Sequence, residues 1–461
     1  MYESFVKRSE KLNYHYKENG DEKVFEIAIM SLMNISLLVS SFIISKKVFG
    51  NKINVVSIYS VVWLLLSFFA LFGFFGLYRP DVGTYLVIQI STITFNTTSI
   101  IVYRHMQKNK NFNTIPDLAD ISKRAQMVIV VLNILAILWL LQFVVKMLPL
   151  LLAGKWVLAR SYYLNASTYH AIYTTKSALI FQWIIFPLIN AGVIVSAYQV
   201  AKGKTKFPLL FVSSIGVVTI VVATAGRNTI FRAAMFYIFA YIMVSNKNFN
   251  LRKRIKDSSK LVKGVLVIAV VALVYITTQR RVGGDSTILE NVMVYFLGPF
   301  IYLDYMLKNP DLFGLDSGML FGRATFGFLT TPLEIIFSML TGRDYAGADN
   351  IVTQYVNSYI PLSDTVEGNA ISTGLYPFIK DFGIIGIVVG SIIFAIIVTF
   401  AYGKTKTTKS NTAYWNCVSI FMLYTVSFSE WQYELLFPAS FTILAILYVT
   451  ISKKHVRISK W

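Results

Sequence analysis

The chain has 461 residues, of which 55% are hydrophobic and 14% are charged, with a mean hydropathy of +0.59 and a formal net charge of +20. Soluble domains carry about 25% charged residues, so this composition excludes an ordinary soluble protein. Apolar runs of ~20 residues, enough for a helix to cross the hydrocarbon core of a membrane, recur along the whole chain. They are continuous rather than alternating, which indicates helices and not the strands of a barrel.

The sequence therefore predicts an all-α fold, a polytopic transmembrane helical bundle of about 11–13 spans with one large outer-face loop region in the C-terminal half. Eight spans are expected before that region, at 24–45, 55–77, 82–103, 126–150, 178–200, 207–225, 229–245 and 261–278. Three more follow it, at 383–402, 412–429 and 434–452. The chain then divides into an N-terminal membrane bundle (1–278), the outer-face loop region (279–382) and a C-terminal membrane bundle with a cytoplasmic tail (383–461).

The positive charge of the chain does not indicate a nucleic-acid partner. Most Lys and Arg residues fall in short loops between spans, where positive charge sets the orientation of a membrane protein. The single cysteine, Cys417, excludes an intrachain disulfide and any cysteine-based metal cluster. Since no P-loop, Ser-His-Asp spacing or metal triad is visible either, we expect no metal and no cofactor.

The distribution of Lys and Arg predicts which loops face the cytoplasm. The loops 46–53, 104–124, 201–206, 246–264 and 403–409 and the tail 453–461 alternate along the chain with less basic segments, and 246–264 is the most basic of them. The positive-inside rule places these loops in the cytoplasm. Segment 279–370, in which acidic residues outnumber Lys and Arg, then faces outward, and the amino terminus falls on the same outer side.

Two apolar stretches interrupt the outward region. Leu289–Met306 is broken by Gly298-Pro299 and by Asp304, and Gly318–Leu340 contains charged residues. Each is compatible with a span, a re-entrant hairpin or an interfacial helix, and if both cross the membrane the orientation of the rest is unchanged. Irregular backbone at membrane depth is tolerated only where protein or water surrounds it, so broken helices here would indicate a cavity.

Arg227 is the first candidate for binding an anion. It follows Gly226 in a tight outward turn between two spans, and Arg232 lies farther along the next span. Arg geometry suits bidentate binding of phosphate. The alternative is structural: Arg227 extends its side chain toward the membrane surface, and Arg232 pairs with a carboxylate in the bundle.

Four further arginines lie in the outward region, namely Arg280, Arg281, Arg323 and Arg343. With Arg227 they form the predicted binding set for an anionic, lipid-linked substrate. Positive charge on the outer side runs against the usual bias and calls for an explanation. For Arg280 and Arg281, contact with lipid headgroups or with Asp285 is the alternative.

Three residues are candidates for accepting a proton in catalysis. Glu367 and Asp381 flank the return of the chain to the membrane, and His170 lies in an outward loop rich in tyrosine. Each has a structural alternative: a solvated loop charge for Glu367, a helix cap for Asp381 and a place in an interfacial aromatic belt for His170. The short outward turn 430–434 is unusually polar and is a candidate for lining the same cavity.

Three short pieces carry a family resemblance. They are the Gly226-Arg227 turn, the aromatic run Tyr295–Phe300 with its Gly-Pro after the double arginine, and the segment from Gly368 to Lys380-Asp381-Phe382-Gly383 that leads directly into a span. Together with the layout of spans and one large outer loop, the chain resembles the bacterial Wzy-type polymerases, which build O-antigen and capsule.

The resemblance implies a multi-pass glycosyltransferase of the bacterial cytoplasmic membrane that joins oligosaccharide repeat units at the outer face. The donor and the acceptor would be glycans linked to undecaprenyl pyrophosphate, and the transfer would be inverting and independent of metal. It also implies membrane lipids, a flippase and a chain-length regulator as partners. An O-antigen ligase-like glycosyltransferase and a flippase or other transporter of lipid-linked oligosaccharides remain open as alternatives.

Overall fold

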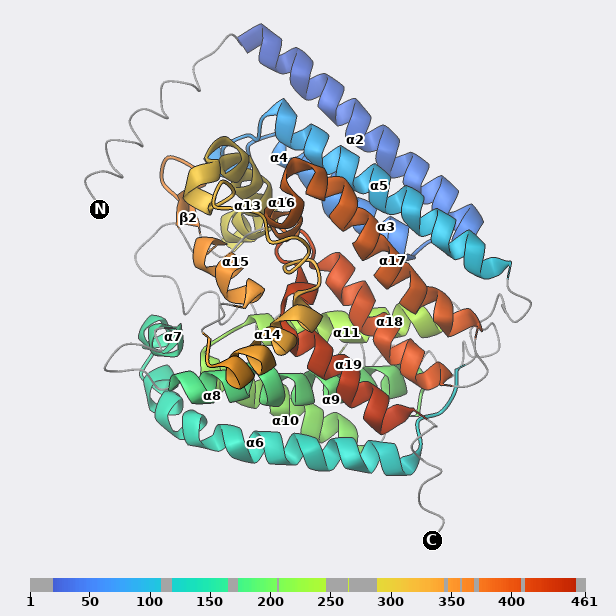
Figure 1. Cartoon of the computed structure of the whole chain (residues 1–461), viewed down its shortest axis with the longest axis vertical. Helices are drawn as coiled ribbons and strands as arrows, with labels where there is room; N and C mark the ends of the chain where they lie inside the picture. The colour runs from blue at the N-terminus through green and yellow to red at the C-terminus, as the bar shows by residue number, and fades with distance from the viewer. Residues whose placement is uncertain are drawn as a thin grey trace.

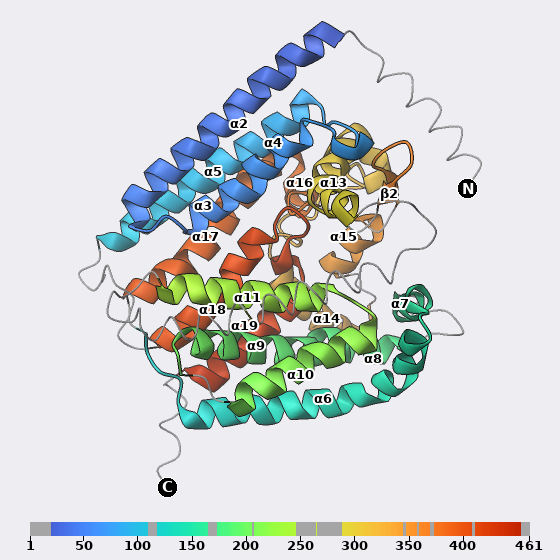
Figure 2. The same ribbon diagram turned by 180° about the vertical axis from the view of Figure 1, so that it is seen from behind.

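Helices form nearly all the regular structure of the protein, as the computed structural model in Figures 1 and 2 shows. The structure describes residues 20–108, 118–164, 173–204, 207–245, 264, 288–343, 347–356, 359–368, 373–407 and 411–452. In these residues the only sheet is a two-stranded hairpin of β1 (Ile360–Pro361) and β2 (Glu367–Gly368). The predicted all-α class is confirmed.

Within the part of the chain that the structure describes, six helices are long and apolar enough to cross a membrane: Phe25–Phe49, Val82–Gln107, Lys123–Leu152, Lys176–Ala201, Phe207–Thr224 and Tyr376–Lys406. Four shorter apolar helices accompany them, at Val55–Ala70, Asn228–Val244, Gly327–Thr341 and Pro438–Ile451. The predicted spans 24–45 to 229–245 and the three C-terminal spans each coincide with a helix. The predicted span at 261–278 lies outside the described residues, apart from Gly264.

The helices have these bounds: α2 (Gly20–Phe49), α3 (Val55–Ser60), α4 (Leu66–Ala70), α5 (Val82–Gln107), α6 (Lys123–Leu152), α7 (Trp156–Leu164), α8 (Thr175–Ile180), α9 (Phe186–Ala201), α10 (Phe207–Thr224), α11 (Asn228–Ser245), α13 (Ile288–Lys308), α14 (Gly327–Thr341), α15 (Ala348–Val356), α16 (Tyr376–Phe382), α17 (Gly386–Thr407), α18 (Thr412–Ser427) and α19 (Pro438–Ile451). Two π-helical turns, η1 (Val61–Leu65) and η3 (Phe181–Ile185), join α3 to α4 and α8 to α9. A 3-10 turn, η7 (Glu434–Leu436), precedes α19.

The helices form two groups that lie side by side (Figures 1 and 2). In the first group α17 packs along α5, and α2 and α3 pack against α5. In the second group α10 packs along α6, and α9 packs against α6, α10, α11 and α19. Helix α18 contacts α17 on one side and α9 and α11 on the other, so it joins the two groups.

Polar side chains inside the bundle are paired across helices. The Tyr59 hydroxyl lies 2.8 Å from the Ser91 hydroxyl, which lies 2.9 Å from that of Ser391, so one chain of hydrogen bonds links α3, α5 and α17. Asn34 and Gln89 likewise join α2 to α5 through a 2.9 Å bond. Because hydrocarbon offers no partner to a polar group, such pairs favour one arrangement of the helices.

One end of the bundle gathers the loops that the charge distribution predicts to be cytoplasmic. Lys202 donates to the Leu118 carbonyl at 2.7 Å and forms an ion pair with Asp120. Gln107 donates to the Val48 carbonyl at 3.1 Å, and Lys406 donates to the Phe49 carbonyl at 3.1 Å. The ends of α2, α5, α9 and α17 therefore meet at this end, which we call the lysine end.

Helix α13 lies across the opposite end of the bundle. Near its C-terminus Asp304 accepts hydrogen bonds of 2.8 Å from the Asp81 amide and from the Thr84 hydroxyl, at the loop before α5. Near its N-terminus the ring of Tyr295 lies under Arg227, in the turn before α11. Both contacts lie at the end of the bundle opposite the lysine end. The structure therefore favours, for Leu289–Met306, a helix that bridges the two groups rather than a membrane span.

Helix α14 is amphipathic and short. Its 15 residues extend about 22 Å, less than a ~30 Å hydrocarbon core. Gly327 packs so closely on η7 that an added Cβ would lie 2.1 Å from the Leu436 carbonyl oxygen. Met339 and Leu340 on the other face are each 80% exposed. The structure therefore favours an interfacial or re-entrant helix over a complete span at Gly318–Leu340.

Candidate functional site

The turn between α10 and α11 is the centre of the candidate site. Helix α10 ends at Thr224 and α11 begins at Asn228, so the tight turn predicted at Gly226-Arg227 is confirmed. Ala225 adopts a left-handed conformation with φ of 47°, which is unfavourable for a residue with a Cβ. Backbone strain of this kind persists where surrounding contacts hold it, and it is common at functional sites.

Arg160 on α7 reaches this turn. Its Nη1 donates to the Thr224 carbonyl oxygen at 3.0 Å, and its guanidinium lies 4.8 Å from the centre of the Tyr163 ring. A Cβ added at Gly226 would lie 3.2 Å from the same Nη1, so glycine leaves room for the arginine. The sequence did not identify Arg160 as a site residue, since no local motif surrounds it and its partner lies far along the chain.

Arg227 lies beside Arg160 and over an aromatic ring. Its guanidinium carbon is 4.1 Å from the centre of the Tyr295 ring, a cation–π contact. Burial, and then the positive charge of Arg160, lower the pKa of Arg227 to about 10. Two neighbouring guanidinium groups carry the same charge and repel each other, so an anion bound next to them would be stabilised. The arrangement is therefore suited to phosphate or pyrophosphate.

An aromatic cluster forms the wall next to Arg227. The indole Nε1 of Trp431 donates to the Tyr295 carbonyl oxygen at 2.5 Å, which fixes the 428–431 turn against α13. The Trp431 ring packs against Phe231, Phe296 and Phe428 with centroid distances of 5.5, 5.1 and 4.8 Å. Residues from α11, α13 and the turn after α18 thus meet at one place. That the 430–434 turn lines a cavity stays a prediction.

Arg232 pairs with a carboxylate in the bundle, which confirms the structural interpretation of this residue. Its Nη2 lies 2.8 Å from Oε1 of Glu434 in a buried ion pair. The Tyr424 hydroxyl donates to the same Oε1 at 3.1 Å. Arg232 therefore holds α11 to η7, directly behind the turn that carries Arg227.

Glu430 is a second buried carboxyl in the same turn. It is 1% exposed, and its Oε2 has no hydrogen-bond partner among the described residues. Burial raises its pKa well above the ordinary value. Its neighbour Ser429 is fixed by Trp63 Nε1 at 2.9 Å and by the Gly374 amide at 2.7 Å. Burial thus favours the neutral form of the Glu430 carboxyl.

The other predicted arginines lie elsewhere or outside the described part. Arg323 forms a 2.6 Å ion pair with Glu334 of α14. Arg343 is exposed just after α14. Arg280 and Arg281 lie outside the described residues. The structure therefore brings Arg160 to the turn that carries Arg227, whereas Arg323 is paired with α14.

The three predicted proton acceptors differ in their surroundings. Asp381 is 0% exposed, and its Oδ1 and Oδ2 accept hydrogen bonds from the Ala324 and Thr325 amides at 3.0 and 2.6 Å. Asp381 lies inside α16 and holds the turn before α14, so the predicted cap on the helix that follows it is wrong. Glu367 is exposed on β2. His170 lies outside the described residues.

Among the residues that the structure describes, no group of three or more His, Cys, Asp or Glu side chains is placed to hold a metal ion. The charges of the candidate site come from its arginines. No protein-family model, no curated protein and no solved structure matches this chain.

Proposed function

We propose that the chain is a polysaccharide polymerase of the Wzy type, in the cytoplasmic membrane of a bacterium. It joins oligosaccharide repeat units carried on undecaprenyl pyrophosphate at the outer face, in O-antigen or capsule synthesis. The observation that carries the proposal is that Arg160 and Arg227 converge on the turn between α10 and α11, where Arg160 binds the Thr224 carbonyl and Arg227 lies over the Tyr295 ring, at the end of the bundle opposite the lysine end.

The proposed reaction is an inverting glycosyl transfer. A hydroxyl oxygen of the acceptor glycan attacks the anomeric carbon of the donor, and the bond from that carbon to the pyrophosphate oxygen breaks. Undecaprenyl pyrophosphate leaves with the bonding electrons, and the hydroxyl proton passes to a base. Arg160 and Arg227 stabilise the negative charge that develops on the pyrophosphate, and they are already oriented before reaction.

Two of the three predicted proton acceptors are proposed as the base. Asp381 uses both carboxylate oxygens to hold the 324–325 backbone, which favours a positioning role for it. Glu367 is open to solvent on the β-hairpin, and that hairpin is fixed to the outer loops where Tyr78 donates to Asp364 at 2.8 Å. Glu367 is therefore one proposed proton acceptor, and His170 is the other because its imidazole can take up a proton near neutral pH.

The aromatic wall supports a glycan ligand. Trp431 is partly exposed beside Arg227, and Tyr295 and Phe296 continue the same surface along α13. Aromatic faces offer flat, apolar area with polar edges, which suits the two faces of a sugar ring. The proposed partners are the donor and acceptor lipids, with a flippase that delivers them and a chain-length regulator.

The direct test is polymer formation by the purified protein from a lipid-pyrophosphate repeat unit. Arg227→Ala and Arg160→Ala are expected to lower the rate by about 10²-fold or more, as loss of a group that stabilises a developing anion does. Arg104→Ala is the matched control, since Arg104 is an exposed arginine in the last turn of α5 at the lysine end. Wild-type rates in both site variants would refute the assignment of the arginine pair.

The same assay separates the two rival functions. A flippase or other transporter would move a labelled lipid-linked oligosaccharide across vesicles without lengthening it. A ligase-like enzyme would transfer the glycan to a different acceptor and would not extend the repeat unit. Lengthening of the lipid-linked chain supports the polymerase, and either of the other two products contradicts it.

A further inference from the structure

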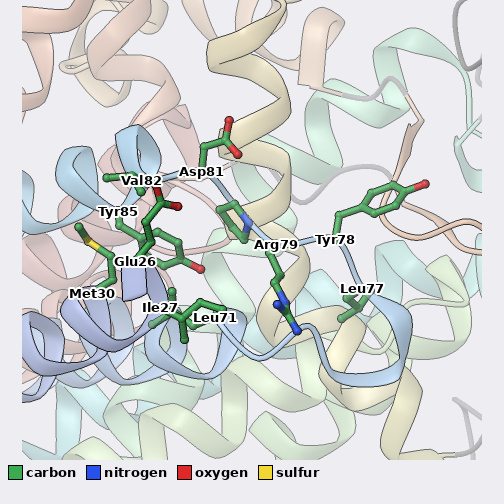
Figure 3. Close-up of a pocket in the computed structure, with 11 residues that line it drawn as sticks. Glu26, Ile27, Met30, Leu71, Leu77, Tyr78, Arg79, Asp81, Val82 and Tyr85 are labelled. Carbon is green, nitrogen blue, oxygen red and sulfur yellow. The ribbon is translucent and has the colours of Figure 1, made fainter. Parts of the chain in front are cut away.

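A pocket of about 350 Å³ opens between α2, the loop 71–82 and α5 (Figure 3). It lies at the end of the bundle opposite the lysine end, because its lining includes Asp81, whose amide binds Asp304 of α13. Its floor is apolar and buried, formed by Met30 and Leu71 with the ring of Tyr85. Its rim carries charged residues, so the pocket is amphipathic.

The rim offers one cation and one carboxylate from different elements. Arg79 lies in the loop before α5, and its Nη2 donates to the Phe72 carbonyl oxygen at 3.5 Å. Glu26 comes from α2. The third charged residue, Asp81, forms a 2.7 Å ion pair with Lys308. Figure 3 shows the Glu26 carboxylate and the Arg79 guanidinium at separate places on the pocket wall.

Tyr85 brings an unsatisfied polar atom into the pocket. The residue is 1% exposed, and its hydroxyl has no hydrogen-bond partner among the described residues. A buried hydroxyl without a partner is costly, and an acceptor oxygen on a ligand would remove that cost.

The surroundings of the pocket place it at the boundary between lipid and water. Four phenylalanines beside it, Phe69, Phe72, Phe74 and Phe75, are between 37% and 44% exposed. Aromatic residues gather at the interfacial level of a membrane. Helix α2 also exposes apolar side chains such as Leu32 and Ile43, as lipid contact requires. A lipid can therefore reach the pocket from the side.

We propose that this pocket binds the headgroup of one phospholipid that carries a primary amine, such as phosphatidylethanolamine. The phosphate accepts hydrogen bonds from Arg79 and from the Tyr85 hydroxyl, and the ammonium group pairs with Glu26. The volume is at the lower end of the ~300–1,000 Å³ range of ligand pockets, which fits a headgroup with the acyl chains outside. The chains lie along the apolar face of α2.

The test compares two lipids that share a phosphate and differ in the amine. Delipidated protein in detergent is titrated with phosphatidylethanolamine or phosphatidylglycerol, and bound lipid is counted by native mass spectrometry. The wild-type protein is expected to retain one phosphatidylethanolamine and to bind it about tenfold more tightly than phosphatidylglycerol. Equal affinity for the two lipids would overturn the proposal.

Three variants assign the contacts. Arg79→Ala is expected to weaken both lipids about tenfold, because it removes the charge that meets the phosphate. Glu26→Gln is expected to remove only the preference for phosphatidylethanolamine. Tyr85→Phe keeps the packing and deletes only the hydroxyl, so weaker binding there supports the site even where Arg79→Ala lowers the yield of folded protein. Arg104→Ala is the control, and loss of binding in it, or unchanged binding in all three variants, contradicts the proposal.

Discussion

Arg232 and Glu434 form an ion pair of 2.8 Å in the interior, with side chains 11% and 4% exposed, although 202 positions separate them in the chain. The pair fixes α11 to the η7 turn, and Tyr424 of α18 adds a 3.1 Å hydrogen bond to the same carboxylate oxygen. One carboxylate therefore positions α11, α18 and the η7 turn relative to one another. The turn that carries Arg227 begins directly before α11, so its position depends on this pair.

Loss of one member of the pair should be much worse than loss of both. Glu434→Ala leaves the Arg232 charge buried without compensation, at a cost of about 3–5 kcal/mol. The double variant Arg232→Met with Glu434→Leu replaces the pair by apolar side chains and should recover most of the loss. Thermal unfolding in detergent is measured for the wild-type protein, for Glu434→Ala, for Arg232→Met and Glu434→Leu singly, and for the double variant. A double variant whose loss equals the sum of the two single losses would contradict a direct pair.

We expect a side chain at position 327 to destabilise the protein, and a side chain at position 83 to be tolerated. A Cβ at Gly327 would lie 2.1 Å from the Leu436 carbonyl oxygen, so alanine there must push α14 away from η7. Such overpacking costs about 1–3 kcal/mol. A Cβ at Gly83 in α5 meets nothing within 4 Å, and alanine there is expected to be neutral or stabilising by up to about 1 kcal/mol. The melting temperatures of Gly327→Ala and Gly83→Ala give the comparison, and equal effects would show that α14 is not packed on η7.

The helices at the predicted spans could be predicted from the sequence because an apolar run is a local property, although only six of the described helices are long and apolar enough to cross a membrane. A run such as 126–150 is apolar whatever surrounds it, and the structure places a helix there, at Lys123–Leu152. The turn at Gly226-Arg227 and the carboxylate partner of Arg232 followed from similarly simple rules: glycine bends the backbone, and a buried charge is paired.

The site itself depends on contacts that no local pattern contains. Arg160 binds the end of α10, next to the turn that carries Arg227, because α7 and α10 pack together. No spacing in the sequence predicts this packing. The sequence of helix α13 has the pattern of an interrupted span. In the structure, Asp304 binds the start of α5, and the helix lies across the end of the bundle. Asp381 was predicted to cap the helix that follows it, but its carboxylate binds the 324–325 turn, which is distant in the sequence.

Asp349 should make the stability of the protein depend on pH. Burial is the largest cause that raises the pKa of this carboxyl above 3.8, and the charge of Glu334 adds to it. The folded state therefore holds the proton more tightly than the unfolded state, so the contribution of Asp349 is greatest at low pH and is lost as the pH rises through its folded-state pKa. Asp349→Asn keeps a neutral side chain at every pH.

The melting temperature of Asp349→Asn should match that of the wild-type protein near pH 4 and exceed it near pH 8. Thr353→Ser on the same helix is a suitable control, because its hydroxyl bonds the Asp349 carbonyl at 2.7 Å and does not titrate in this range. If the wild-type protein were relatively more stable at the higher pH, Asp349 would be stabilised in its charged form and the predicted sign of the pH dependence would be wrong.

The orientation of the bundle can be tested with the protein's own chemistry. Cys417, the single cysteine of the chain, is buried, so a Cys417→Ala background should carry no reactive thiol. Thr365 is exposed on the β-hairpin at the end that holds the arginine pair, and Lys108 is exposed at the lysine end. In intact cells, or spheroplasts if an outer membrane is present, a membrane-impermeant maleimide should label Thr365→Cys directly and Lys108→Cys only after permeabilisation. The reverse pattern would place Arg160 and Arg227 in the cytosol, away from the lipid-linked glycans, and the proposed polymerase would have to be abandoned.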